Sequence, residues 1–160
     1  MANWTMDLNK YCKDKQVEMK KVRKAYAFAL YSSIVKKTPV DTGRARANWN
    51  VSVGKEDTSV DDASQYKNKK KDGGSSKPPV KLKYKNMDSI PEPSGDESIF
   101  ISNNLPYIGT LEYGGYPNPP DKDGGKTVNG FSKQAPEGMV GVTLANNEAI
   151  FNAAVRSVKK

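Results

Sequence analysis

The chain contains no histidine and a single cysteine, Cys12, among its 160 residues. Histidine is the commonest general base and the commonest metal ligand, so its absence removes the usual chemistry of both roles. A lone cysteine excludes an intramolecular disulfide and a zinc site built from cysteine and histidine. The acidic pairs Asp61-Asp62 and Asp96-Glu97 lie in polar segments and are interpreted as solvated charges. We therefore predict that the protein is not an enzyme and has no catalytic, cofactor or metal site.

Long apolar runs are also missing. No stretch approaches the roughly 20 apolar residues of a membrane-spanning helix, and the first residues lack the charged-then-apolar pattern of a secretory signal. Hydrophobic residues make up 36% of the chain, less than is usual for a compact soluble domain. We expect a soluble protein with no membrane partner, made in a reducing compartment, whose residues 1–160 form one domain.

Basic residues outnumber acidic ones, 26 to 18, which gives a formal net charge of +8. Such an excess favours contact with polyanions or with an acidic protein surface. The positive residues are spread along the chain, and no nucleic-acid-binding motif is present. Charge alone therefore predicts an anionic neighbour without identifying DNA. Candidate DNA-facing lysines are Lys20, Lys21, Lys24, Lys69, Lys70 and Lys71.

The pattern of apolar residues predicts an α+β fold with extended loop or hairpin insertions. Apolar residues at helical spacing predict a long helix over 7–37, after a short arm over 1–6, with Ala25–Tyr31 as its most buried part. A C-terminal helix is expected over 132–158, with Pro136 near its start. Both helices are expected to pack on a small antiparallel sheet.

Residues 38–54 are predicted to form a corner between helix and sheet, followed by a strand. Pro39 disfavours helical geometry at Thr38, Asp41 or Thr42 is suited to accept hydrogen bonds from the backbone amides that follow, and Gly43 permits a left-handed turn. Trp49 then begins a run of alternating apolar and polar residues, typical of a half-buried strand.

The remaining segments divide into an insertion and a second set of elements. Residues 55–96 are lysine-rich and too polar to build a core of their own. Two interpretations stay open for them: a disordered loop, or an extended hairpin with Val80, Leu82 and Tyr84 on one face that is ordered by a neighbour. Residues 97–114 predict a strand and a short helix beginning near Pro106, and 115–131 a loop.

Three short motifs carry a resemblance to a known family. The motifs are Thr38–Arg44 with Trp49 following, Ile101–Tyr107 with Leu111–Gly114, and Ser132–Val140. In this order they resemble the signatures of small neck and tail-completion proteins of tailed bacteriophages, over about 38–54 and 97–158. The loop over 115–131 and the lysine-rich insertion are departures from the family pattern.

The resemblance implies a structural virion protein without catalysis, made in the cytoplasm of the bacterial host. Such a protein forms a ring at the head–tail junction or the head-proximal end of the tail, for which we expect six subunits. It would join tail to head beside other neck and tail proteins, and a basic face of the ring is a candidate lining of the DNA channel.

We expect the subunit interface to include residues of the corner, the second motif and the insertion: Arg44, Arg46, Trp49, Tyr107, Glu112, Tyr113, Val80, Leu82 and Tyr84. Arg44 and Arg46 are predicted to pair with acids such as Glu112 or with a neighbouring subunit. The alternative hypothesis is a basic nucleic-acid-binding module, in which lysines contact phosphates and Tyr66 and Tyr84 stack on bases.

Overall fold

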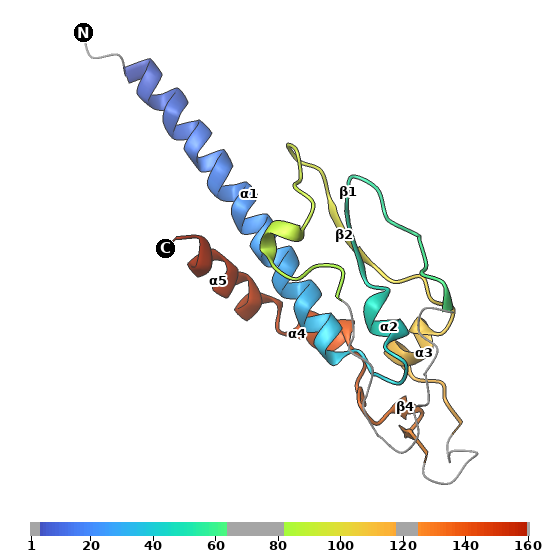
Figure 1. Ribbon diagram of the computed structural model, residues 1–160. Helices are drawn as coiled ribbons and strands as arrows, with labels where there is room; N and C mark the ends of the chain where they lie inside the picture. Colours follow the sequence, from blue (N-terminus) through green and yellow to red (C-terminus); the bar gives the residue numbers. More distant parts are fainter. Residues whose placement is uncertain (1–3, 64–81, 118–124, 160) are drawn as a thin grey trace.

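The structure, a computed structural model, describes residues 4–63, 82–117 and 125–159 (Figure 1). It confirms the predicted α+β class, with a long N-terminal helix, a C-terminal helix and two antiparallel sheets of two strands each. No helix within these residues is long and apolar enough to cross a lipid bilayer.

Helix α1 spans Trp4–Lys37, so it begins at Trp4 and includes part of the segment expected as an arm. Its C-terminal half carries the buried side chains, among them Ala25, Ala27 and Tyr31, as predicted. Further toward the N-terminus the described side chains from Lys13 to Met19 are exposed, and Met19 is 64% exposed. In Figure 1 the N-terminal part of α1 extends well beyond the body of the molecule.

The main sheet pairs β1 (Asn50–Val53) with β2 (Ile99–Ser102) in antiparallel register, with Val51 opposite Ile101. One face of this pair packs on the core, because Val51 is buried and both isoleucines of β2 contact the buried cluster. The alternation that predicted the first strand is followed only in part, because Asn50 is buried beside Val51. Helix α1 contacts the sheet through β2.

The core gathers side chains from distant parts of the chain. Its largest fully buried members include Tyr31 of α1, Ile90 of the insertion and Met139 of the third motif. Ile90 follows the 3₁₀ turn η2 (Met87–Ser89), which Asn86 and Ser89 cap reciprocally. The described residues 82–96 of the insertion are thus tied to the body, and residues 82–85 form no strand, contrary to the hairpin prediction.

The region after β2 contains more structure than its sequence indicated. Helix α3 spans Ile108–Tyr113 and begins later than Pro106, with Tyr107 at its N-cap. Gly114, at φ 79°, ends it as expected. The predicted loop over 115–131 holds a small hairpin of β3 (Thr127–Val128) and β4 (Phe131–Ser132).

The predicted single helix over 132–158 is wrong in its first part. Residues 132–139 form β4 and turns, Gly138 adopts φ 80°, and two helices follow, α4 (Val140–Ala145) and α5 (Asn147–Val158). Helix α5 lies along α1 (Figure 1), where Phe151 meets Tyr26 edge to face with ring centroids 5.4 Å apart.

Candidate interface around the Thr38–Trp49 corner

The corner between α1 and β1 is a tight, internally bonded turn. Gly43 adopts φ 88°, in the left-handed region that favours glycine. The hydroxyl oxygen of Thr42 accepts a hydrogen bond from the backbone amide of Arg44 at 3.3 Å. A single helical turn, α2 (Arg44–Ala47), follows and was not predicted. The corner therefore fixes the backbone positions from which Arg44 and Arg46 project.

Trp49 belongs to the core and not to a surface. Its side chain is 5% exposed, and its indole N–H donates to the Thr38 hydroxyl at 2.8 Å. That hydroxyl in turn donates to the carbonyl of Ile34 at 2.8 Å. The prediction of Trp49 as an interface residue is therefore wrong, because the indole faces inward with Val51 and links the corner to the end of α1.

Arg46 bonds to carbonyls of its own chain. Its guanidinium donates to the Thr38 carbonyl, with Nη2 at 2.8 Å, and to the Lys36 carbonyl at 3.1 Å. The last carbonyls of a helix lack partners within the helix and carry partial negative charge, so a guanidinium stabilises them. Burial lowers the pKa of Arg46, as expected for a cation partly removed from water. Arg46 is thus a helix cap, and within residues 4–63, 82–117 and 125–159 its predicted pairing with an acid is not found; contact with a neighbouring subunit stays a prediction.

Glu112 is committed to the start of α4. Its carboxylate accepts hydrogen bonds from the backbone amides of Met139, Val140 and Gly141, each at 2.8 Å. These amides lie at the positive end of a helix, where a carboxylate is favoured. The predicted ion pair between the corner arginines and Glu112 is therefore wrong: Glu112 joins the second motif to the third.

Two further links complete a motif cluster, which we define as the corner with Ile101–Gly114 and Ser132–Val140. The amide side chain of Gln134 bonds the backbone of Val40 in both directions, each at 3.0 Å. Asn103 donates from its side chain to the Ala45 carbonyl at 2.8 Å. The three sequence motifs, far apart along the chain, are therefore parts of one bonded unit.

Arg44 differs from its neighbours in the cluster. Its Nη2 donates to the Asp61 carbonyl at a long 3.3 Å, and its Nε is buried with no hydrogen-bond partner among the residues that the structure describes. It lines a hollow of about 460 Å³, the corner pocket. The wall of this pocket includes Asp41, Arg44, Ala45, Tyr107, Leu111 and Tyr116. Asp41 and Tyr116 were not predicted as site residues, and Tyr116 carries no sequence signal beyond its loop position.

Two of the predicted interface residues lie at the surface, at the two ends of α3. Tyr107 is 37% exposed and Tyr113 is 82% exposed, an unusual value for an aromatic side chain. Burial of the phenol raises the pKa of Tyr107, while the nearby Arg44 charge acts in the opposite direction. These two tyrosines are accessible to a neighbour.

Tyr84 is occupied within its own chain. Its hydroxyl accepts from the Val51 amide at 3.1 Å and donates to the Val51 carbonyl at 2.8 Å. Its ring also meets Tyr31 edge to face, with centroids 5.1 Å apart. Tyr84 therefore covers the free edge of β1; because its side chain is only partly buried, its role at a subunit interface stays a prediction. Leu82 is 37% exposed and stays a candidate, and Val80 lies outside the described residues.

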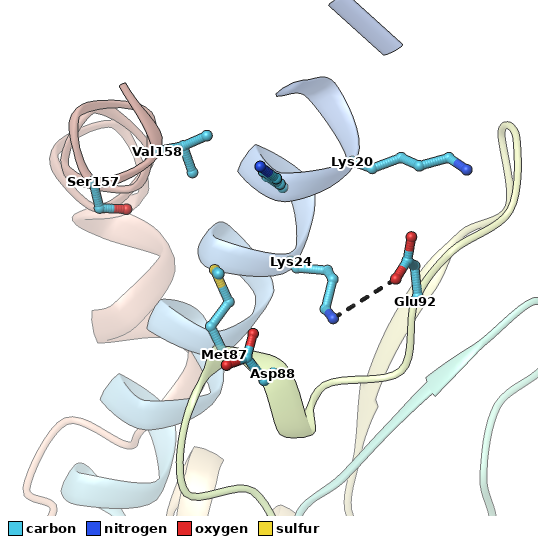
Figure 2. A pocket seen from close by; sticks show the side chains of 8 residues that line it. Lys20, Lys24, Met87, Asp88, Glu92, Ser157 and Val158 are labelled. Atoms are coloured by element: carbon cyan, nitrogen blue, oxygen red, sulfur yellow. Dashed lines mark ion pairs between the residues drawn. The ribbon is translucent and has the colours of Figure 1, made fainter. Parts of the chain in front are cut away.

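The basic residues of α1 lie in surroundings of mixed charge. Lys20, Lys21 and Lys24 line a hollow of about 670 Å³ that also contains Asp88 and Glu92. Figure 2 shows Lys20 and Lys24 extending to the side of α1 that faces Glu92, with Ser157 and Val158 on its other side. Lys24 lies 4.0 Å from the Glu92 carboxylate. Lys69, Lys70 and Lys71 lie outside the described residues.

Within the part of the chain that the structure describes, no three histidine, cysteine, aspartate or glutamate side chains come together in a way that could hold a metal ion.

No family model, no curated protein and no solved structure matches the chain. The likeness of its three motifs to the phage family stays a prediction.

Proposed function

We propose that the chain is a structural virion protein that forms a ring at the head–tail junction, or at the head-proximal end of the tail, of a tailed bacteriophage. In that ring it joins tail to head beside other neck and tail proteins. The observation that carries the proposal is the motif cluster. The three segments that resemble the family's signatures are bonded to one another through Gln134, Asn103 and Glu112, as expected if they are signatures of one fold.

The surface of the cluster favours contact with other subunits. Tyr113 exposes 82% of its side chain area, and exposed aromatic residues are enriched at protein interfaces. The corner pocket opens between the corner and α3, next to Tyr107. A head-to-tail ring requires two different complementary surfaces on each subunit, of which this is a candidate for one.

The protruding part of α1 is a candidate for the second surface. Lys13, Glu18 and Met19 are exposed there, and the rest of the body lies against the C-terminal half of the helix (Figure 1). Helices gain most of their stability from packing, so a helical segment without a packing partner is marginal in water. A neighbouring subunit laid against this segment would supply that partner.

A nucleic-acid-binding module is the second candidate function, favoured by the closely spaced Lys20, Lys21 and Lys24 on α1. Contact with DNA phosphates would be independent of sequence and would weaken steeply with salt. Gel-shift experiments with the isolated chain at moderate salt distinguish the two candidates. A structural ring protein is expected to leave free duplex DNA unshifted, whereas a stable complex with the monomer would favour the second candidate.

Genetic complementation tests the proposed function. A phage that encodes the chain and carries a deletion of its gene is grown with and without the protein supplied from a plasmid, and particles are counted by negative-stain electron microscopy. We expect separate heads and tails without the protein and joined particles with it. Normally joined, infectious particles in its complete absence would reject the proposal.

A further inference from the structure

The corner pocket contains a guanidinium that the described residues of its own chain leave incompletely bonded. Arg44 Nε is buried without a hydrogen-bond partner, and within the described residues Arg44 enters no ion pair. Among the described residues, the one hydrogen bond of its guanidinium is the 3.3 Å contact with the Asp61 carbonyl. A buried donor without a partner costs free energy, and an arginine fork matches a carboxylate in two parallel hydrogen bonds. The site is thus arranged to accept an anionic oxygen pair.

The other polar groups of the pocket are compatible with a carboxylate. The hydroxyls of Tyr107 and Tyr116 form no hydrogen bond with described residues and are able to donate. Tyr107 and Tyr116 line the same pocket as Arg44. Asp41 also lines the pocket, but Lys126 lies 2.7 Å from its carboxylate and offsets its charge. The net charge of these groups is therefore positive.

The size and walls of the pocket select the form in which the carboxylate arrives. A hollow of about 460 Å³ is larger than a free inorganic anion requires, and Pro39, Ala45 and Leu111 supply apolar wall. A side chain with methylene groups below its carboxylate would cover that wall while its oxygens reach Arg44. The whole chain carries a net charge of +8, so acidic groups of a partner are attracted to it.

We propose that the corner pocket binds the carboxylate of an acidic side chain, aspartate or glutamate, presented by a neighbouring protein of the assembly. Arg44 holds the carboxylate oxygens, and Tyr107 and Tyr116 donate to them from the rim. That the carboxylate comes from a neighbour in the assembly rests on the proposed function. That the pocket binds a carboxylate rests on its lining residues alone.

The test uses the free full-length chain and a minimal probe. N-acetyl-glutamate N-methylamide carries one carboxylate on a side chain, and N-acetyl-glutamine N-methylamide is its neutral match. The Arg44 Nε–H resonance is followed by ¹⁵N–¹H NMR at constant ionic strength. We expect a saturable shift with the glutamate probe, with a dissociation constant on the order of 1–10 mM, and no shift with the glutamine probe. Arg44→Gln should abolish binding detected at the Tyr107 and Tyr116 rings, whereas Arg156→Gln, which removes the same charge from exposed α5, should retain it.

Equal shifts with both probes, or no saturable shift with either, would overturn the inference. If the Arg44 Nε–H resonance of the wild-type chain also shifts as the protein concentration is raised without probe, the carboxylate comes from a second copy of the chain. If the resonance shifts with the glutamate probe but not with protein concentration, the carboxylate comes from a different protein. The binding experiment needs no phage particle, so its result is independent of the complementation test. If the pocket binds the probe but heads and tails join without the protein, the proposed function is refuted and the binding inference stands.

Discussion

At the scale of single residues, the two arginines of the corner have separate roles although they are one residue apart. Arg46 donates to the carbonyls of Lys36 and Thr38 and so completes the end of α1. Arg44 has a buried Nε without a partner and faces the corner pocket. A double replacement of both arginines would mix a folding defect with an assembly defect, so the two are better tested singly.

Arg46→Ala is expected to lower the free energy of unfolding by about 1–3 kcal/mol, because it removes charge-assisted hydrogen bonds to helix-end carbonyls. Arg44→Ala is expected to change it by less than about 0.5 kcal/mol, since the described residues give the Arg44 guanidinium one long hydrogen bond. Urea unfolding followed by circular dichroism measures both. Equal losses in the two variants would contradict this division of roles.

Tyr31 predicts a pH dependence of stability. Tyr31 is 1% exposed, and burial raises the pKa of its phenol above the ordinary 10.0, although the backbone of Tyr84 and Lys83 beside the hydroxyl acts in the opposite direction. The free energy of unfolding that the neutral Tyr31 phenol contributes is therefore complete below pH 10. It is lost as the pH rises toward the folded-state pKa, because the unfolded chain releases the proton first. Tyr31→Phe should change the free energy of unfolding at pH 7 by no more than about 1 kcal/mol, because the hydroxyl has only weak hydrogen-bond partners to lose.

The same variant should then lose less stability than the wild type between pH 9 and about 11. Urea titrations at several pH values check this difference. Parallel pH profiles for the two proteins would show that the Tyr31 hydroxyl is not the group responsible.

At the scale of elements, the third motif is shaped by its contact with α3. Gly138 has φ 80°, and a Cβ added there would collide with the backbone carbonyl of Glu112. The carboxylate of Glu112 then holds the first amides of α4. The close approach of Gly138 to the Glu112 carbonyl requires a turn with positive φ at Gly138. Residues 132–139 are therefore not part of the C-terminal helix that the sequence pattern predicted.

Gly138→Ala is accordingly expected to destabilise the fold by more than about 2 kcal/mol, from the left-handed backbone and the collision together. Gly109→Ala is the matched control: Gly109 lies in α3, and a Cβ there meets no atom within 4 Å. That change should stabilise the fold by about 0.5–1 kcal/mol. Thermal unfolding of both variants decides; a tolerated Gly138→Ala would contradict the packing of the third motif on α3.

The elements also show what the sequence was able to predict. Signals contained within a few residues were reliable: Gly43 turns the corner, Gly114 ends α3, and α1 ends before Pro39. Contacts between distant residues had no local signal. Tyr84 on the edge of β1 and Glu112 at the start of α4 were therefore assigned to an interface when both are used within the chain. The two-residue strands β3 and β4 are too short to show a period.

At the scale of the whole molecule, the chain is a body formed around the C-terminal half of α1, with the other half projecting from it (Figure 1). Tyr107, Tyr113 and the corner pocket lie on the body, at the motif cluster. If the proposed ring forms, we expect its subunits to contact one another through the motif cluster and the projecting part of α1.

Tyr113→Ser is expected to leave the stability of the isolated chain within about 0.5 kcal/mol, because the side chain is 82% exposed. If Tyr113 contacts a neighbour, the same change should reduce the yield of joined particles in complementation several-fold. Leu144→Ser, at a site 49% exposed on α4, is the control and should complement normally. Full joining with the Tyr113 variant would remove this surface from the interface.

The most direct test of the central claim is the composition of purified virions. Mass spectrometry of tailed particles from the phage that encodes the chain, with cryo-electron microscopy of the same particles, measures its presence and position. The proposal predicts a ring of identical copies at the head–tail junction or the head-proximal end of the tail, with the motif cluster at the contact between neighbours. Absence of the chain from purified virions would contradict it.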